Sequence, residues 1–346
     1  MKSRILSNVA GIALACSAFA LFTQAAQAQT VSAPFAADYV LADLGPVSSL
    51  PFPYGGLTFK AGDPSTILIG GNANTAAGLL YSISVVRGAD MHITGFSGSA
   101  TAVGTVGAFN DGGVVYGPGG VLFTSQWPEN KLGQTKPGST GEDKVIDLAP
   151  LGVAGSHAAL NFVPGGFGGA SQMKLVSWGG GEFYTAAYAP DGSGTFDITS
   201  VTQVDLDSST LAMDNLPGGP EGFVYIKAGN PGFLANAMLV SEFSDGNVVA
   251  YDLDSEGNPL VATRRELVIG LVGAEGAAID PLTGDFLFST FGTAEDRVVV
   301  LRGFTKLPPA LPEPASVLLF GLALAGLTLI RSGSRCQETR LARLAK

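Results

Sequence analysis

Two glutamates and one histidine hold equivalent places in a unit that recurs along the chain, and these side chains are the best candidates for chemistry. Glu221 and Glu275 are each followed by glycine at the start of a copy of this unit. Shifting the sequence by 64 residues aligns His157 with Glu221. Asp111 stands near the start of an earlier copy. Two carboxylates with one imidazole can hold a divalent ion, and hard oxygen ligands favour calcium. The competing interpretation is that each side chain satisfies turn amides or faces water.

Other chemistry has weaker support. The chain has only two histidines and no Gly-x-Ser-x-Gly sequence, so nothing favours a serine nucleophile. The acidic run 252–258 resembles a calcium loop, but Thr263 stands where an EF-hand needs glutamate, and a hairpin tip is expected instead. Trp127 and Trp178 follow equivalent runs and are candidates for stacking on a sugar ring, although packing in the core or rim is the commoner role.

The elements that must position these side chains are short strands. Copies of the unit start near residues 55, 112, 157, 221 and 275, about 55 residues apart on average. Each copy contains runs of Val, Ile, Leu, Phe and Tyr that are bounded by Gly, Pro, Asn or Asp, which is typical of strands joined by hairpins. We therefore expect about four antiparallel strands in each unit.

The two ends of the body complement each other. The segments 29–54 and 275–305 are each about half a unit, so an N-terminal strand is expected to complete the last sheet. A radial array closes its ring in this way. The predicted fold is an all-β propeller of five or six four-stranded blades over residues 29–305, with a β-sandwich or β-solenoid as the alternative.

Within this body, the Glu-Gly pairs at the starts of the copies and the segment 278–285 resemble sequences of six-bladed propellers of the gluconolactonase and senescence-marker type. The resemblance implies that a glutamate in the channel binds a divalent cation. Only Glu221 and Glu275 match that glutamate by position.

Composition agrees with an all-β chain and excludes several classes. Among 346 residues there are 48 Gly and 20 Pro, and the net charge is −10. Residues 29–312 hold 12 basic and 27 acidic side chains, so the body is more acidic than the whole. Nucleic-acid binding is not expected because it needs a basic face. The two cysteines, Cys16 and Cys336, exclude a disulfide framework.

The first 28 residues have the pattern of a signal peptide. Lys2 and Arg4 precede an apolar stretch, and Ala26-Gln27-Ala28 is the small-x-small pattern that signal peptidase accepts. Cleavage is expected after Ala28, with export across the inner membrane.

The last residues have a different pattern. A linker, 306–311, leads to Pro312-Glu313-Pro314, then to an uncharged run over 315–330, then to Arg331 and Arg335. Sixteen residues span about 24 Å as a helix, which is a marginal membrane span. The arginines would keep the C-terminus in the cytoplasm and leave the body outside.

This tail, 312–346, resembles the PEP-CTERM sorting signal of exopolysaccharide-producing Gram-negative bacteria. The resemblance implies that the membrane protease-transpeptidase exosortase removes it, as the GPI machinery removes its own signal. Here the chain continues to Lys346 beyond the usual compact basic end, and an ordinary C-terminal anchor is the alternative.

The sequence thus predicts an exported protein of the cell envelope or extracellular matrix. The preferred function is a non-enzymatic binding or structural propeller that contacts exopolysaccharide or surface proteins. The alternative is a metal-dependent propeller hydrolase or lactonase of gluconolactonase-like type.

Overall fold

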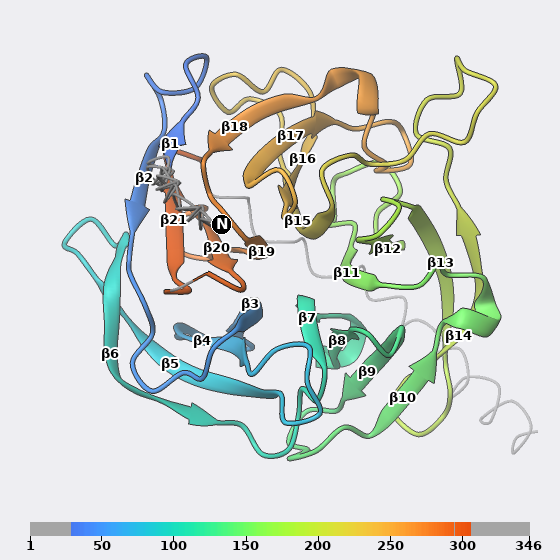
Figure 1. Ribbon diagram of the computed structural model, residues 1–346, viewed down its shortest axis with the longest axis horizontal. Coiled ribbons are helices and arrows are strands. Elements are labelled where there is room, and N and C mark those ends of the chain that lie inside the picture. Colours follow the sequence, from blue (N-terminus) through green and yellow to red (C-terminus); the bar gives the residue numbers. More distant parts are fainter. Residues whose placement is uncertain (1–28, 294, 306–346) are drawn as a thin grey trace, which may run out of the picture.

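Five antiparallel sheets surround a central axis, and each sheet is one blade of a β-propeller (Figure 1). The computed structural model describes residues 29–293 and 295–305. The predicted signal peptide, linker, sorting motif and C-terminal helix lie outside these ranges. Within them, no helix is both long and apolar enough to cross a membrane.

Each blade is a meander whose strands follow one another outward from the axis. Blades 1 and 2 consist of β3 (Tyr54–Lys60), β4 (Asp63–Gly71), β5 (Leu79–Arg87), β6 (Ile93–Ala102), and β7 (Asn110–Tyr116), β8 (Leu122–Gln126), β9 (Lys131–Thr135), β10 (Lys144–Asp147). Blade 3 consists of β11 (His157–Phe162), β12 (Met173–Ser177), β13 (Phe183–Pro190) and β14 (Phe196–Gln203). Short 3-10 turns occur at Pro118–Gly120, Ala149–Leu151 and Val261–Thr263.

The last two blades each take a strand from the N-terminal segment. Blade 4 consists of β15 (Pro220–Ile226), β16 (Ala237–Glu242), β17 (Asn247–Asp252), β18 (Arg265–Ile269) and β1 (Thr30–Val31). Blade 5 consists of β19 (Ala274–Ile279), β20 (Phe286–Thr290), β21 (Val298–Arg302) and β2 (Val40–Asp43). The propeller prediction is confirmed with five blades, which excludes the sandwich and the solenoid.

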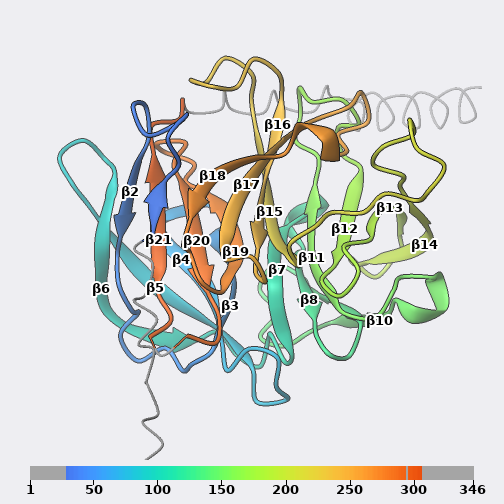
Figure 2. The same cartoon turned by 45° about the horizontal axis from the view of Figure 1, so that its top comes forward.

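Ring closure is achieved as the sequence predicts. β2 pairs antiparallel with β21, from Val40 opposite Arg302 to Asp43 opposite Val299 (Figures 1 and 2). Asp43 also forms an ion pair of 2.6 Å with Arg297. The sequence pattern does not predict the pairing of β1 with β18, which adds a fifth strand to blade 4.

The hydrophobic core is divided among the seams between blades. Each pair of neighbouring blades shares one cluster of described residues; that between blades 4 and 5 includes Phe233, Leu239 and Phe288. The cluster between blades 1 and 2 is small and includes Leu68 and Val114. Because neighbours cover both faces of a blade, strands such as Val298–Arg302 are apolar along most of their length instead of alternating.

Serines on second strands tie neighbouring blades together beside the axis. Ser125 Oγ accepts the N–H of Gly113 at 2.8 Å and donates to the Ala158 carbonyl of blade 3 at 2.6 Å. Ser289 Oγ links Gly276 of its own blade to the Gly55 carbonyl of blade 1. The serines near the ends of β8 and β20 therefore link neighbouring blades beside the axis.

We expect Ser125→Ala to lower the free energy of unfolding by roughly 1–3 kcal/mol, because a buried N–H and a buried carbonyl both lose their partner. Urea unfolding measures the loss. Ser241→Ala is the matched control, since Ser241 is an equivalent buried serine whose Oγ has no hydrogen-bond partner. Equal losses in the two variants would contradict the seam role.

Candidate metal centre at the propeller axis

Every inner strand begins with an irregularity in its pairing that re-aims the side chains near the axis. The register shifts lie between Tyr54 and Leu57, Asn110 and Val114, His157 and Ala159, Pro220 and Phe223, and Ala274 and Ala277. Such β-bulges bend a strand and change the direction of its side chains. The equivalent positions within them are Gly55, Asp111, His157, Glu221 and Glu275.

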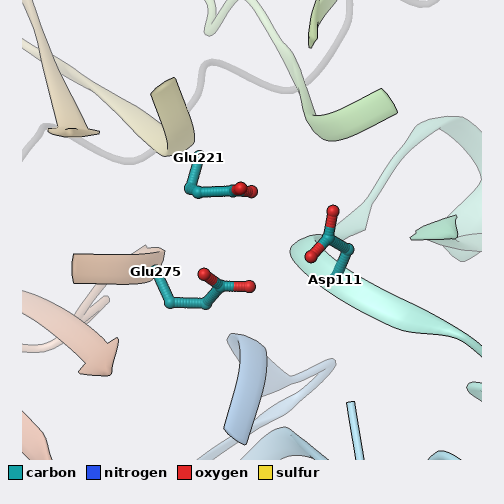
Figure 3. Close-up of side chains that lie close together, drawn as sticks. All are labelled: Asp111, Glu221 and Glu275. Atoms are coloured by element: carbon teal, nitrogen blue, oxygen red, sulfur yellow. The ribbon is translucent and has the colours of Figure 1, made fainter. Parts of the chain in front are cut away.

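Three of these positions bring carboxyl groups together. Asp111 of β7, Glu221 of β15 and Glu275 of β19 point toward one another, and one oxygen from each lies within 4.8 Å of the others (Figure 3). Glu221 is 5% exposed, and Asp111 and Glu275 are each 1% exposed. We call these three residues the axial triad.

The close approach depends on residues that lack side chains. A Cβ atom on Gly222 would lie 2.5 Å from the Ala277 nitrogen, and one on Gly276 would lie 2.5 Å from the Gly56 Cα. A Cβ on Gly56 would lie 2.5 Å from the Gly112 carbonyl oxygen. Because any larger residue would push the inner strands apart, these glycines set the spacing of the carboxyl groups.

Burial and mutual repulsion disfavour the charged forms of the triad. Burial raises the pKa of Asp111 to about 7, although contacts from Glu275, Asn74 and the Gly112 N–H oppose the rise. The pKa values of Glu221 and Glu275 are raised well above their usual range, first by burial and then by the neighbouring carboxylates. The raised pKa of Glu275 favours its protonated form in the metal-free site, where its carboxyl group lies against that of Asp111.

The oxygens that remain are suited to a cation. Asp111 Oδ2, Glu221 Oε2 and Glu275 Oε1 are buried and have no hydrogen-bond partner. Buried polar atoms are normally paired, so three orphans at one point require a ligand or water. Carboxylate oxygens are the donors that calcium and magnesium prefer. The triad therefore fits a hard divalent cation.

His157 does not join the triad, and its predicted role as a ligand is corrected. It occupies the equivalent bulge position, but Nδ1 lies 3.1 Å from the carbonyl oxygen of Lys131 in blade 2. Its ring is thus held against a neighbouring blade. Burial lowers the pKa of His157 to about 4, so the imidazole is neutral. Asp111, which the sequence also places near the start of a copy, supplies the third carboxyl group instead.

The two tryptophans are not in ring contact with each other in the described part of the chain. Both are half-buried just beyond second strands. Trp178 meets Phe243 edge to face at 6.3 Å and packs against the core cluster between blades 3 and 4. Packing accounts for Trp178, and sugar stacking by either residue stays a prediction.

The axial channel continues past the glycines as a small cavity. Its volume is about 160 Å³, and its lining includes Thr58, Gly112, Asn161 and Ile279. Small-molecule sites usually measure about 300–1,000 Å³, so this cavity is smaller than a typical binding site.

The run that resembled a calcium loop is a hairpin tip, as expected. Asp254 accepts the backbone N–H groups of Glu256 and Asn258 at 2.8 Å. The ammonium group of buried Lys174 donates to Asn258 Oδ1 at 2.6 Å. The loop is therefore held by backbone N–H groups and by Lys174.

Sequence comparisons give no family for the chain: no family model and no curated protein matches it. Similar solved structures include the PQQ-bound aldose sugar dehydrogenase of Streptomyces coelicolor, at 12% identity and a TM-score of 0.35, covering 76% of this chain and 98% of that one. An oxidoreductase of Thermus thermophilus, assigned as a glucose dehydrogenase, has 14% identity and a TM-score of 0.42, with 76% and 99% covered. A protein assigned as a gluconolactonase has 12% identity and a TM-score of 0.41, with 81% and 100% covered. Likeness at this level concerns the fold alone.

The preferred functional prediction, a non-enzymatic binding or structural propeller, is corrected here. The physical reason for the correction lies in the triad itself. A purely structural axis has no need for three buried acids with unpaired oxygens, whose burial costs stability.

We expect the metal-free protein to lose stability as pH rises from about 4 to about 7. The unfolded chain releases the Asp111 proton near pH 3.9, whereas the folded protein retains it up to about pH 7, so unfolding is favoured progressively in between. Glu275→Gln keeps a donor for Asp111 without a charge. It should flatten this profile and add about 1 kcal/mol or more at pH 8.

Thermal unfolding across this pH range measures both effects. Glu295→Gln removes a carboxylate whose side chain is 71% exposed and should leave the profile as in the wild type. A wild-type profile without slope, or one that Glu275→Gln leaves unchanged, would show that the triad is not strained in this way.

Proposed function

We propose that the protein is a hydrolase that depends on a divalent cation at the axial triad and acts on a small ester or lactone. One observation carries the proposal: three buried carboxyl groups from three blades converge with unpaired oxygens. The site lies where the inner strands β7, β15 and β19 begin. The cation is the simplest way to compensate these groups without protonating them.

Calcium is the cation that we propose. All three ligands are carboxylate oxygens, and His157 is held away from them. The body has no cysteine between residues 29 and 305, so thiolate ligands are absent from it. Oxygen-only ligand sets are typical of calcium, magnesium and manganese, and they do not favour zinc or copper.

When bound, such a cation supplies Lewis-acid polarisation of an ester carbonyl. The chain supplies the charge balance and a proton acceptor. Asp111, Glu221 and Glu275 would each supply one oxygen to the cation, and Glu221, the most exposed of the three, would use its second oxygen as the proton acceptor. Burial, and then the nearby carboxyl group of Asp111, raise the pKa of Glu221 in the metal-free site.

In the proposed reaction Glu221 accepts a proton from water as the water oxygen adds to the carbonyl carbon. The carbon–oxygen bond of the ester then breaks, and the proton passes from Glu221 to the leaving alkoxide. The backbone on which Glu221 stands is fixed by the β15 bulge and by contact of Gly222 with Ala277. This rigidity keeps the base in place for the reaction.

The purified protein should bind calcium with release of protons, because deprotonated ligands replace protonated ones. Calorimetry in buffers of different ionisation enthalpy measures the release. Glu221→Gln combined with Glu275→Gln should weaken binding by about tenfold or more and abolish hydrolysis of simple lactones such as aldonolactones.

Glu182→Gln is the control for this pair. Glu182 also has a buried oxygen without a partner, but it does not belong to the triad. It should retain calcium binding and activity. Absence of heat and of any thermal shift with calcium, magnesium and manganese in the wild type would contradict the proposal.

We further propose that the protein is exported and sorted to the cell envelope or extracellular space. The support is the sequence alone: a signal peptide before Gln29, and the PEP-CTERM-like motif, apolar run and arginines after residue 311. Signal peptidase and exosortase are the implied partners. Contact with exopolysaccharide or surface proteins also stays a prediction.

The surface form should lack the segment from Arg331 to Lys346 if exosortase removes the tail. Mass spectrometry of the protein released from cells measures its C-terminus, and a variant with Pro312-Glu313-Pro314 replaced by alanines should retain the tail. Finding the 331–346 peptide on the wild-type surface form would contradict processing.

A further inference from the structure

Blade 1 contributes no side chain to the axial triad from its inner strand. Its equivalent position is Gly55, where a Cβ atom would lie 2.3 Å from the Asn110 side-chain oxygen. The turn after β4 reaches the same region by another route. Its residue Asn74 donates its backbone N–H to the Asn110 carbonyl at 2.9 Å, immediately before Asp111.

Asn74 has three features that are unusual together. Its φ angle is +62°, in the left-handed region that asparagine tolerates better than most residues. Its side chain lies close enough to the carboxyl group of Asp111 to lower the pKa of that group. Its Oδ1 atom is buried and has no hydrogen-bond partner. A strained residue with an orphaned polar atom beside a functional site is a sign of function.

We infer that Asn74 Oδ1 is a fourth protein ligand of the axial cation. The inference rests on the proposed function, because it names a further ligand of the same site. An amide oxygen is a hard donor of the kind that calcium accepts. It is also neutral, so it adds a ligand without adding to the repulsion among Asp111, Glu221 and Glu275.

The same side chain serves the metal-free site in a different way. There the amide lies beside Asp111 and lowers the pKa of that carboxyl group. The terminal torsion of asparagine is broad and roughly two-fold, so a half-turn exchanges the donor for the oxygen. Asn74 can therefore support the carboxylate before the cation arrives and coordinate the cation afterwards.

The chain offers a matched control two residues away. Asn72 is also an asparagine with positive φ, +49°, in the same turn. Its carbonyl accepts the Thr75 hydroxyl at 2.7 Å, but its side chain is not among the groups that contact Asp111. Asn72→Ala therefore reproduces the backbone strain of Asn74→Ala and leaves the triad untouched.

The experiment titrates the purified full chain, freed of metal, with terbium as a luminescent substitute for calcium and checks displacement by calcium. Asn74→Ala should weaken terbium binding by about 10- to 100-fold. Luminescence lifetimes in light and heavy water count the bound waters, which should increase by about one because water fills the vacated ligand position. Asn74→Asp should retain the affinity, and Asn72→Ala should match the wild type in both measurements.

The results separate this inference from the proposed function. Wild-type affinity and an unchanged water count in Asn74→Ala would overturn the role of Asn74 while leaving the triad as the metal site. Equal losses in Asn74→Ala and Asn72→Ala would also overturn it, because backbone strain would then explain them. Failure of the wild-type protein to bind terbium or calcium would overturn both.

Discussion

The close approach of the five inner strands at the axis is the constraint on which the rest of this structure depends. Gly56, Gly222 and Gly276 permit it, since a Cβ atom on any of them would collide with the backbone of a neighbouring blade. Bulges at the strand starts then turn side chains toward the axis, where only a few can fit. The ring therefore brings oxygens of Asp111, Glu221 and Glu275 within 4.8 Å of one another. It leaves no room between them for a bulky side chain.

That geometry has an electrostatic consequence. Three carboxyl groups removed from water cannot all ionise without a compensating positive charge, which is why burial raises the pKa of each. Among the described residues, no arginine, lysine or histidine forms an ion pair with the triad. Buried acids elsewhere are treated differently, since Glu242 accepts Arg264 and Asp280 accepts Arg87. The protein thus pairs Glu242 and Asp280 with its own cations and leaves the acids at the axis for protons or a metal.

The sequence was informative where a property repeats and much less so where it does not. Recurring apolar runs predicted the blades, the half-units at the two ends predicted closure by β2, and the repeated Glu-Gly starts predicted that Glu221 and Glu275 meet. Repetition fixes where a backbone position lies but not where its side chain points, so the repeat places His157 at the axis although its ring faces Lys131. Asn74 lies in a turn of one blade and has no counterpart in the repeat, so no pattern in the sequence points to it. The phrase 278–285, which carried the resemblance to lactonases, forms a turn whose Asp280 and Asp285 pair with Arg87 and His92.

Those two pairs connect closure of the ring to the site. Blade 5 is built from both ends of the body and carries Glu275 on its inner strand, so Glu275 reaches the axis only when this blade packs against blade 1. Arg87 and His92, both of blade 1, hold the turn of blade 5 at 2.6 and 2.5 Å. Nearer the axis, the Ser289 hydroxyl donates to the Gly55 carbonyl, and Gly276 lies against Gly56. Closure by β2 completes the sheet from which all these contacts are made. Because one of the three acids depends on this seam, an open ring would retain most of its blades and lose the metal centre.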